Sequence, residues 1–290
     1  MKLFNFGSLN IDHVYDVTHQ VQTGETITAT SYDVFIGGKG LNQSIAASKA
    51  GAQVVHIGAI GPDGSLLKEA LVNAGVDVSQ LIETDTPSGH AIIQVNEQGD
   101  NAIIVYGGAN QQLSKTAIDQ VFHLITPEDI VLLQNEISNV DYIIERAYER
   151  KIPVVLNYSP ITESLSLIDL NKVSYLLVNE IEGRAAAKDS QVIEVLTRAY
   201  PQLSVVLTLG DKGAKFAKAG REVITQKAYE AVVVDTTGAG DTFTGFFVAS
   251  VLSNKSIKEA LDLSCKASAI AIGKSGASNS VPTLEEVLDK

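Results

Sequence analysis

The sequence predicts an α/β protein, with a mostly parallel β-sheet between two layers of helices and a small second β-sheet. From residue 130 onward, short apolar runs alternate with helix-like segments, which is typical of parallel strands covered on both faces. Residues 14–36 and 88–106 interrupt this alternation with strand-like patterns. The chain has 290 residues, 45% of them hydrophobic, which suits one large core. We expect a single domain over residues 1–290, with the two interrupting segments as a lid.

The N-terminal half mixes both kinds of element. Leu3 to Gly7 predicts a first strand, and extended conformation is expected to continue through Asn10 and Asp12. Glu97-Gln98-Gly99-Asp100 predicts a hairpin turn. The further elements expected here are half-exposed strands within 14–36 around a turn at Thr23-Gly24, a helix over 43–50, a strand over 54–60, a helix over 65–74, strands over 88–95 and 101–106, and a helix over 115–123.

The C-terminal half alternates more regularly. The expected strands cover 130–134, 154–157, 175–178, 204–209 and 231–234, and the expected helices cover 140–150, 191–200 and 243–252. Active sites in such sheets lie beyond the carboxyl ends of the strands, so polar residues that follow strands should gather there. These residues are Asn10, Asp12, Glu136, Asn157, Asn179, Asp211 and Asp241.

The stretch from Asp235 to Asp241 carries the most specific chemistry. Gly238 and Gly240 let a ligand approach the main chain where a helix begins, and the unpaired N–H groups of that first turn form an anion hole. A carboxylate repels phosphate, so Asp241 suits another task, which is to take a proton from an attacking hydroxyl. Plain helix capping by Asp241 is the competing interpretation. The glycine spacing fits neither a Walker A loop nor a dinucleotide fingerprint.

Two polar clusters in the N-terminal half have a functional and a structural interpretation. Asn10 and Asp12 would point to the same face of an extended strand and match a polyol, or they belong to a polar loop. Lys39 and Asn42 would lie in the first turn of a helix, in the Gly-rich stretch with glycines at 37, 38 and 40. They would then bind a substrate, or decorate a simple packing turn.

Two further clusters in the C-terminal half are also open to both interpretations. Asn179 and Glu182 lie where a strand gives way to a helix, so they suit Mg²⁺ through its waters or cap the helix. The turn from Thr208 through Gly210 to Gly213 would contact a nucleotide phosphate, or would only join two strands.

The composition argues against several classes of function. The net charge of −12, the pI of about 4.8 and the lack of a Lys/Arg cluster argue against nucleic-acid binding. Cys265 is the only cysteine, which excludes an intrachain disulfide and a Cys-based zinc site. No apolar run approaches the ~20 residues of a membrane span, and residues 2–7 look like a strand rather than a signal peptide. We therefore expect a cytoplasmic protein with small-molecule partners and no membrane or nucleic-acid partner.

Together these stretches resemble the ribokinase-like carbohydrate kinases, over almost the whole chain from Leu3 to Pro282. The shared motifs are Gly-Ser-x-Asn-x-Asp, Gly-Gly-Lys-Gly-x-Asn, Asn-x-x-Glu, Thr-Leu-Gly and Asp-Thr-x-x-Ala-Gly-Asp-Thr-Phe. The resemblance implies a Rossmann-like, three-layer α/β/α domain with a β lid. It also implies ATP and Mg²⁺ as cofactors, a monovalent cation that is typically K⁺, and a homodimer formed through the lids.

The resemblance also implies a role for individual residues. Asp241 resembles the catalytic base, beside an anion hole made by Gly238, Ala239 and Gly240. The positions that resemble sugar contacts are Asn10, Asp12, Gly38, Lys39, Asn42 and Glu136. Those that resemble nucleotide or Mg²⁺ contacts are Asn179, Glu182, Thr208, Gly210, Gly213 and Gly240. Those that resemble the cation loop are Asp235, Thr237, Ala271, Lys274, Gly276 and Ser280.

The sugar-facing positions fit family members that phosphorylate D-ribose at its primary hydroxyl. Two stretches near the sugar depart from the family pattern, Asn157-Tyr158-Ser159-Pro160 and Gln134-Asn135 beside Glu136. Another sugar or a nucleoside is therefore the alternative substrate. A non-catalytic sugar-binding regulator is the alternative from another class.

Overall fold

The computed structural model describes the backbone of residues 1–290 and every side chain except those of Ser164 and Ser166. Its central sheet has the strand order β14-β13-β12-β11-β10-β9-β1-β4. The strands from β12 to β4 in this order pair in parallel, whereas β13 and β14 are added antiparallel. The strands are β1 (Leu3–Phe6), β4 (Val54–Ile57), β9 (Ile130–Leu133), β10 (Val154–Asn157), β11 (Tyr175–Asn179), β12 (Ser204–Thr208), β13 (Ala214–Lys218) and β14 (Ile224–Gln226).

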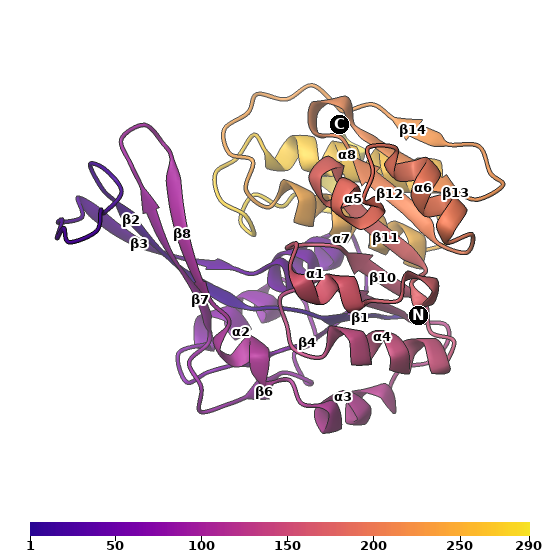
Figure 1. Ribbon diagram of the computed structural model, residues 1–290, viewed down its shortest axis with the longest axis horizontal. Helices are drawn as coiled ribbons and strands as arrows, with labels where there is room; N and C mark the ends of the chain where they lie inside the picture. The colour runs from indigo at the N-terminus through magenta and orange to yellow at the C-terminus, as the bar shows by residue number, and fades with distance from the viewer.

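Helices cover both faces of this sheet, so the predicted fold class is confirmed (Figure 1). Side chains alternate along a strand, and Leu3 and Phe4 of β1 therefore enter different cores. The core around Leu3 includes α1 (Lys39–Lys49), α2 (Ser65–Asn73), α7 (Ala239–Leu252) and α8 (Ile257–Ala271). The core around Phe4 includes α3 (Lys115–Phe122), α4 (Val140–Glu149) and α6 (Val192–Ala199), with α5 (Glu180–Ala187) packed against it.

The remaining helices are short. α9 (Leu284–Leu288) packs against α8. Single 3₁₀ turns lie at η1 (Gly108–Gln112), η2 (Glu163–Leu167), η3 (Leu170–Lys172) and η4 (Gly210–Lys212). Within the described part of the chain, no helix has both the length and the apolar character that a membrane crossing requires.

A second sheet projects from the body of the molecule, on the left in Figure 1. Its order is β3-β2-β7-β8, where β2 spans Asn10–Asp16, β3 Ser31–Gly37, β7 Gly89–Val95 and β8 Asn101–Tyr106. The predicted hairpin is confirmed, because β7 and β8 pair antiparallel. A two-stranded parallel pair, β5 (Ala59–Ile60) with β6 (Ile82–Glu83), lies at the base of this sheet. We call the four-stranded sheet the lid sheet.

Residues 231–234 are not a strand, so that prediction was wrong. Val232 is 83% exposed and Val234 is 61% exposed. The N–H groups of Val234 and Asp235 donate to the carbonyl oxygen of Ile272 at 2.8 and 3.1 Å, at the end of α8. β-Branched residues favour strands only where a sheet receives them, and here the chain runs along a helix end instead.

Several predicted boundaries also differ from the structure. The extended run from Leu3 to Asp12 is broken after Phe6, and β2 joins the lid sheet rather than the central one. The alternating residues 26–30 precede β3 instead of forming a strand. Likewise, the strand expected over 54–60 divides into β4 and β5, and the helix expected over 43–50 begins at Lys39.

Candidate active site

Asp241 lies in the first turn of α7 and is directed at α1. Its Oδ2 accepts a hydrogen bond from Nδ2 of Asn42 at 3.0 Å, and its Oδ1 accepts one from Nε2 of Gln43 at 2.8 Å. The residue is only 8% exposed. A capping carboxylate would instead accept from the first backbone N–H groups of its own helix, so the capping interpretation was wrong. Two side-chain amides hold this carboxylate between the two helices.

The start of α7 is left without a side-chain cap. Gly238 occupies the N-cap with a φ of 73°, and among the described side chains none accepts a cap hydrogen bond there. A Cβ at Gly238 would lie 2.9 Å from Cα of Ala277, so the position requires glycine for its conformation and for space. Ala239 N–H makes a long bond of 3.3 Å to the Thr236 carbonyl oxygen. The positive end of the helix dipole therefore faces any anion placed there.

Lys39 and Asp241 influence each other electrostatically. Burial raises the pKa of Asp241, while the Lys39 ammonium and the hydrogen bonds from Gln43 and Asn42 oppose the rise. Burial lowers the pKa of Lys39, but the carboxylates of Asp241, Glu136 and Glu182 outweigh it and raise that pKa overall. A carboxylate with a raised pKa is a better proton acceptor, and the adjacent ammonium attracts anionic ligands.

The predicted sugar-binding residues of the Gly-rich turn and of β9 meet next to Asp241. α1 begins at Lys39, directly after Gly38, whose φ is 93°. Glu136 follows β9 and accepts a hydrogen bond from the backbone N–H of Lys39 at 3.0 Å and another from the Ser8 hydroxyl. A Cβ at Gly38 would lie 3.0 Å from the backbone nitrogen of Asn10. Only glycine allows the turn to approach β2 this closely.

Asn10 and Asp12 lie two residues apart on β2, so both side chains are on one face of the lid sheet, as the sequence predicts. Burial, and then the Glu136 carboxylate, raise the pKa of Asp12 to about 6. A Cβ at Gly37 would lie 2.2 Å from Oδ2 of Asp12. The structure therefore brings the predicted sugar-binding residues of the lid sheet, of the turn and of the segment after β9 into one polar cluster.

Sequence reasoning assigned no role to four polar residues that hold this cluster in place. Asn110 donates to Oδ1 of Asn10 at 2.8 Å, and the N–H of Gly40 donates to the Ser8 hydroxyl at 3.2 Å. Two of them gave a signal in the sequence: Gln134 is an amide directly after an apolar strand, and Ser8 belongs to the Gly-Ser-x-Asn-x-Asp motif. The four residues are Ser8, Gln43, Asn110 and Gln134.

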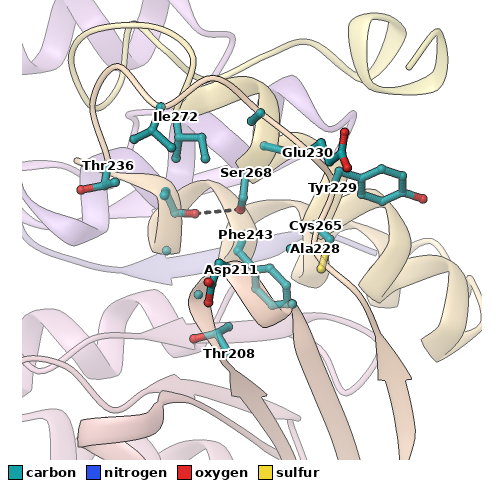
Figure 2. Close-up of a pocket in the computed structure, with 17 residues that line it drawn as sticks. Thr208, Asp211, Ala228, Tyr229, Glu230, Thr236, Phe243, Cys265, Ser268 and Ile272 are labelled. Atoms are coloured by element: carbon teal, nitrogen blue, oxygen red, sulfur yellow. Dashed lines mark hydrogen bonds between the residues drawn. The ribbon is translucent and has the colours of Figure 1, made fainter.

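A cavity of about 600 Å³ lies beside the start of α7 (Figure 2). It is lined by four of the residues predicted to contact a nucleotide, Thr208, Gly210, Gly213 and Gly240. Much of its wall is apolar, with Val233, Phe243, Cys265, Ala269 and Ile272. The segment predicted as a turn is both a β12–β13 connection and part of this wall. The size and the apolar wall suit a planar heterocyclic base, and Gly240 connects the cavity to Asp241.

Asn179 and Glu182 form a capping box at the start of α5, as their structural interpretation predicts. Asn179 Oδ1 accepts from the N–H of Glu182, and Glu182 Oε2 accepts from the N–H of Asn179, both at 2.9 Å. Neither residue lines the cavity. Glu182 nevertheless acts on the Lys39 ammonium, so its charge reaches the site. Within the described residues, no group of three or more His, Cys, Asp or Glu side chains is placed to hold a metal ion.

Asp235 joins the two loops that contain most of the predicted cation-binding positions, whereas Ala271 is the last residue of α8. Its Oδ1 accepts from the N–H of Thr237 and its Oδ2 from the N–H of Gly276, both at 2.9 Å. The hydrogen bond from the Thr237 side chain and those from both N–H groups lower the pKa of Asp235. The Lys274 ammonium pairs with Glu286 at 3.2 Å. The Asp235 carboxylate thus keeps its negative charge at neutral pH.

Comparison with known proteins identifies the family of this chain. The profile of the pfkB family carbohydrate kinases matches residues 2–284. The chain belongs to this family. The protein is therefore a carbohydrate kinase, an enzyme that transfers a phosphoryl group to an alcohol.

Relatives within the family are similar over nearly their whole length. Ribokinase of Haemophilus influenzae is 35% identical over 294 residues, covering 98% of this chain and 96% of that protein. The structure of Arabidopsis thaliana ribokinase complexed with ribose and ATP has a TM-score of 0.87 and 30% identity, with 99% of this chain and 97% of that one covered. The nucleoside kinase of Methanocaldococcus jannaschii has a TM-score of 0.81 at 16% identity, with 100% and 97% covered, which shows a shared fold only.

Proposed function

We propose that this kinase transfers the γ-phosphoryl group of ATP to the primary hydroxyl of D-ribose and forms ribose 5-phosphate. One observation carries the proposal: the buried carboxylate of Asp241 lies between a nucleotide-sized cavity and a cluster of polyol-binding side chains. The relatives named ribokinase, at 30–35% identity, support ribose as the acceptor. The Asn10–Asp12 pair suits a neutral polyol, because the Asp12 carboxylate would repel the phosphate of a phosphorylated sugar.

In this proposal Asp241 is the catalytic base. The ribose oxygen forms a bond to the γ-phosphorus, its proton passes to Asp241, and the bond to the β–γ bridging oxygen breaks to release ADP. N–H groups of Gly238, Ala239 and Gly240 stabilise the charge on the transferring group. General-base catalysis typically contributes ~10²–10⁴-fold, one anion-hole donor about 10²–10³-fold, and alignment of the reactants on the order of 7–11 kcal/mol.

The substrates are assigned to the two sides of Asp241. Ribose binds to the polar cluster of Asn10, Asp12, Gly38, Lys39, Asn42 and Glu136. The nucleotide binds in the cavity at Thr208, Gly210, Gly213 and Gly240. The lid sheet supplies Asn10 and Asp12 from β2, so closing it over the sugar would exclude the water that otherwise hydrolyses ATP.

Two metal ions belong to the proposal. Glu182, with Asn179, would hold Mg²⁺ through its waters, and a single carboxylate suffices because this ion takes most remaining ligands from phosphates and water. When bound, Mg²⁺ would neutralise part of the negative charge of the ATP phosphates. The loops joined by Asp235 would hold a monovalent cation, at Asp235, Thr237, Ala271, Lys274, Gly276 and Ser280. The lowered pKa of Asp235 and the pairing of Lys274 with Glu286 leave the negative charge there that a cation requires.

The proposal includes a homodimer formed through the lid sheets. Ile104 on β8 is 66% exposed, and the strand register places the exposed side chains of Ile92 and Val34 on the same face of the sheet. Contiguous exposed apolar side chains of this kind mark an interaction surface. A second copy of the chain is the partner that offers the same surface in return. The cytoplasmic location remains a prediction of the sequence.

A coupled assay of ADP release tests the proposal. The purified protein is given ATP and Mg²⁺ with ribose, other pentoses, hexoses or nucleosides, each with and without K⁺. We expect ADP release that depends on ribose and increases with K⁺. Greater activity on a nucleoside or a hexose would contradict ribose as substrate. ATP consumption that no acceptor stimulates would instead point to a sugar-binding regulator.

A further inference from the structure

Asp241 is connected to the centre of the protein by two buried glutamines. Gln43 lies on α1 and Gln134 directly follows β9, and neither is exposed beyond 1%. Gln43 Nε2 donates to Oδ1 of Asp241 at 2.8 Å, and Gln43 Oε1 accepts from Nε2 of Gln134 at 2.7 Å. Gln43 therefore uses both ends of its amide, one on the carboxylate and the other on Gln134.

The direction of these hydrogen bonds is fixed from the far end. The Asn5 side chain donates to the carbonyl oxygen of Gly40 and to the Ser44 hydroxyl, both at 2.8 Å. A carbonyl oxygen can only accept, so the nitrogen of the Asn5 amide faces it and its oxygen faces the other way. That oxygen accepts from Nε2 of Gln134 at 3.0 Å. The Gln134 nitrogen consequently donates, the Gln43 oxygen accepts, and the Gln43 nitrogen is left for Asp241.

We propose that Gln134, oriented by Asn5, is a positioning residue that fixes the Gln43 amide with its N–H toward Asp241. The inference rests on the proposed role of Asp241 as the base. If the Gln43 amide turned over, its oxygen would lie against the carboxylate and would favour the protonated form. Held in place, Gln43 keeps Asp241 ionised and aimed between ribose and the nucleotide. Gln134 acts on the reaction without contacting either substrate.

The Lys39 ammonium also favours the ionised form of Asp241, and more strongly than the Gln43 hydrogen bond does, but the hydrogen bond from Gln134 is what orients the Gln43 amide. Lys39 on α1 is the neighbouring charge, and Glu136 and Glu182 act on Lys39 in turn. At the far end, the Ser44 hydroxyl contacts Nδ1 of His56 at 2.8 Å. Burial lowers the pKa of His56 to about 4, so this ring is neutral where the enzyme would work. Burial raises the pKa of Asp241 and the Gln43 hydrogen bond opposes the rise, so losing that bond should raise the pKa further.

Substitution by methionine tests the proposal, because methionine has nearly the volume of glutamine and no amide. The variants are Gln43→Met, Gln134→Met and the double variant, with Gln120→Met on the exposed surface of α3 as the control. For Gln43→Met we expect the acid limb of kcat/KM to move up by about one pH unit, as loss of a hydrogen bond to a charged group implies. We also expect kcat to fall about 10-fold or more, with both KM values within about threefold.

Gln134→Met should move the acid limb in the same direction, and the double variant should move it no further than Gln43→Met alone. A merely structural role would lower the melting temperature and leave the acid limb in place. The proposal is overturned if Gln134→Met keeps the wild-type acid limb, or if the two shifts add. Asp241→Asn separates the two levels of the argument: near-normal turnover would refute the base itself, whereas an inactive variant beside unshifted glutamine variants would refute only the positioning role.

The wild-type protein offers a second measurement if the variants do not fold. In nitrogen NMR, the side-chain amides of Gln43 and Gln134 should both titrate with the midpoint of the acid limb, and that of Gln120 should not. A Gln134 amide that does not respond over this pH range overturns the proposal.

Discussion

Nδ2 of Asn42 lies 3.0 Å from Oδ2 of Asp241, although 199 positions separate the two residues in the chain. The bond joins the first turns of α1 and α7, which are the two glycine-initiated helices of the site. Among the described groups, no donor reaches the buried Oδ1 of Asn42. A buried oxygen without a donor costs free energy, and a sugar hydroxyl would supply the missing bond. Asn42 can therefore hold both Asp241, the proposed base, and the sugar hydroxyl that this base would deprotonate.

Replacement of the proposed base, Asp241, by its amide should abolish most turnover without disturbing the fold. Asp241→Asn keeps the size of the side chain but cannot accept the proton, so we expect kcat to fall by ~10²–10⁴-fold. The melting temperature should not fall, because burial of the charged carboxylate is unfavourable. Steady-state kinetics and calorimetric titration with an ATP analogue measure both effects. Nucleotide affinity should stay within a few-fold of wild type, and turnover above about a tenth of normal would contradict the assignment.

Gly240 offers a substitution that should separate stability from activity. A Cβ at this position meets no atom within 4 Å, although Gly240 lines the cavity proposed for the nucleotide. In a helix, alanine is favoured over glycine by roughly 0.5–1 kcal/mol, so Gly240→Ala should not destabilise the protein. The added methyl group would occupy the space needed by the phosphates. We expect kcat/KM for ATP to fall by at least about tenfold. The loss should not exceed the about 10²–10³-fold that one anion-hole donor typically contributes.

Gly220→Ala is the matched control for this change. Gly220 also has open space around it, but its φ is 72° and it lies in the connection between β13 and β14. The strained backbone should cost stability, while ATP kinetics remain normal. Gly240→Ala should therefore lower the rate of ADP release and not the melting temperature. Gly220→Ala should lower the melting temperature and not the rate of ADP release. Normal kinetics in Gly240→Ala would argue against phosphate binding at this helix start.

Much of the fold could be predicted from the sequence because strands such as β1, β4, β9 and β10 of the central sheet are buried on both faces. Residues 130–133 and 205–207 are uninterrupted runs of Ile, Val and Leu, too short for a typical helix, and the structure has strands there. The wrong strand at 231–234 shows the limit of this reasoning. Its valines have the correct composition, but they lie beside the end of α8, where no strand can pair with them. Composition alone does not indicate whether a partner strand is present.

The candidate site was predictable where a local pattern encodes it. Gly38 and Gly238 each precede a helix, and the polar residues after β1, β9 and β12 follow from the rule that parallel strands end together. The contacts of Gln43 could not be predicted, because Gln134 lies 91 positions away. A buried glutamine looks the same in the sequence as an exposed one. Only the tertiary structure shows which amides meet the base.

The raised pKa of Asp12 makes stability depend on pH. Its pKa is about 6 in the folded protein, above the ordinary aspartate value of 3.8, so the folded state binds the proton more readily. The stabilisation that protonated Asp12 contributes is fully present below about pH 4 and is lost as the pH rises through about 6. Asp12→Asn should therefore raise the melting temperature at pH 7.5, by an amount that shrinks toward pH 4. The stabilisation should be on the order of 1–3 kcal/mol at pH 7.5.

The same substitution should weaken sugar binding. A carboxylate that accepts from a hydroxyl is worth roughly 1.5–3 kcal/mol, so we expect KM for ribose to increase about 10- to 100-fold with KM for ATP unchanged. Asp33→Asn, on the neighbouring strand β3, is the control for changing a charge on the lid sheet. Equal KM values for ribose in Asp12→Asn and wild type would remove Asp12 from the sugar site.

The edge strand β8 supports the proposed dimer and can be tested by placing a charge on it. Ile103, Ile104 and Val105 are all more than half exposed, with Ile104 at 66%. An exposed apolar edge strand is a liability unless another chain covers it. Glutamate at the centre of such an interface would have to lose its water without a partner, which costs several kcal/mol and should dissociate the dimer. We expect sedimentation equilibrium to find a wild-type dimer and an Ile104→Glu monomer at the same concentration.

Val72→Glu on α2, where Val72 is 53% exposed, should remain dimeric because α2 lies outside the lid sheet. A wild-type protein that stays monomeric at every concentration, or an Ile104→Glu variant that stays dimeric, would exclude pairing through this surface.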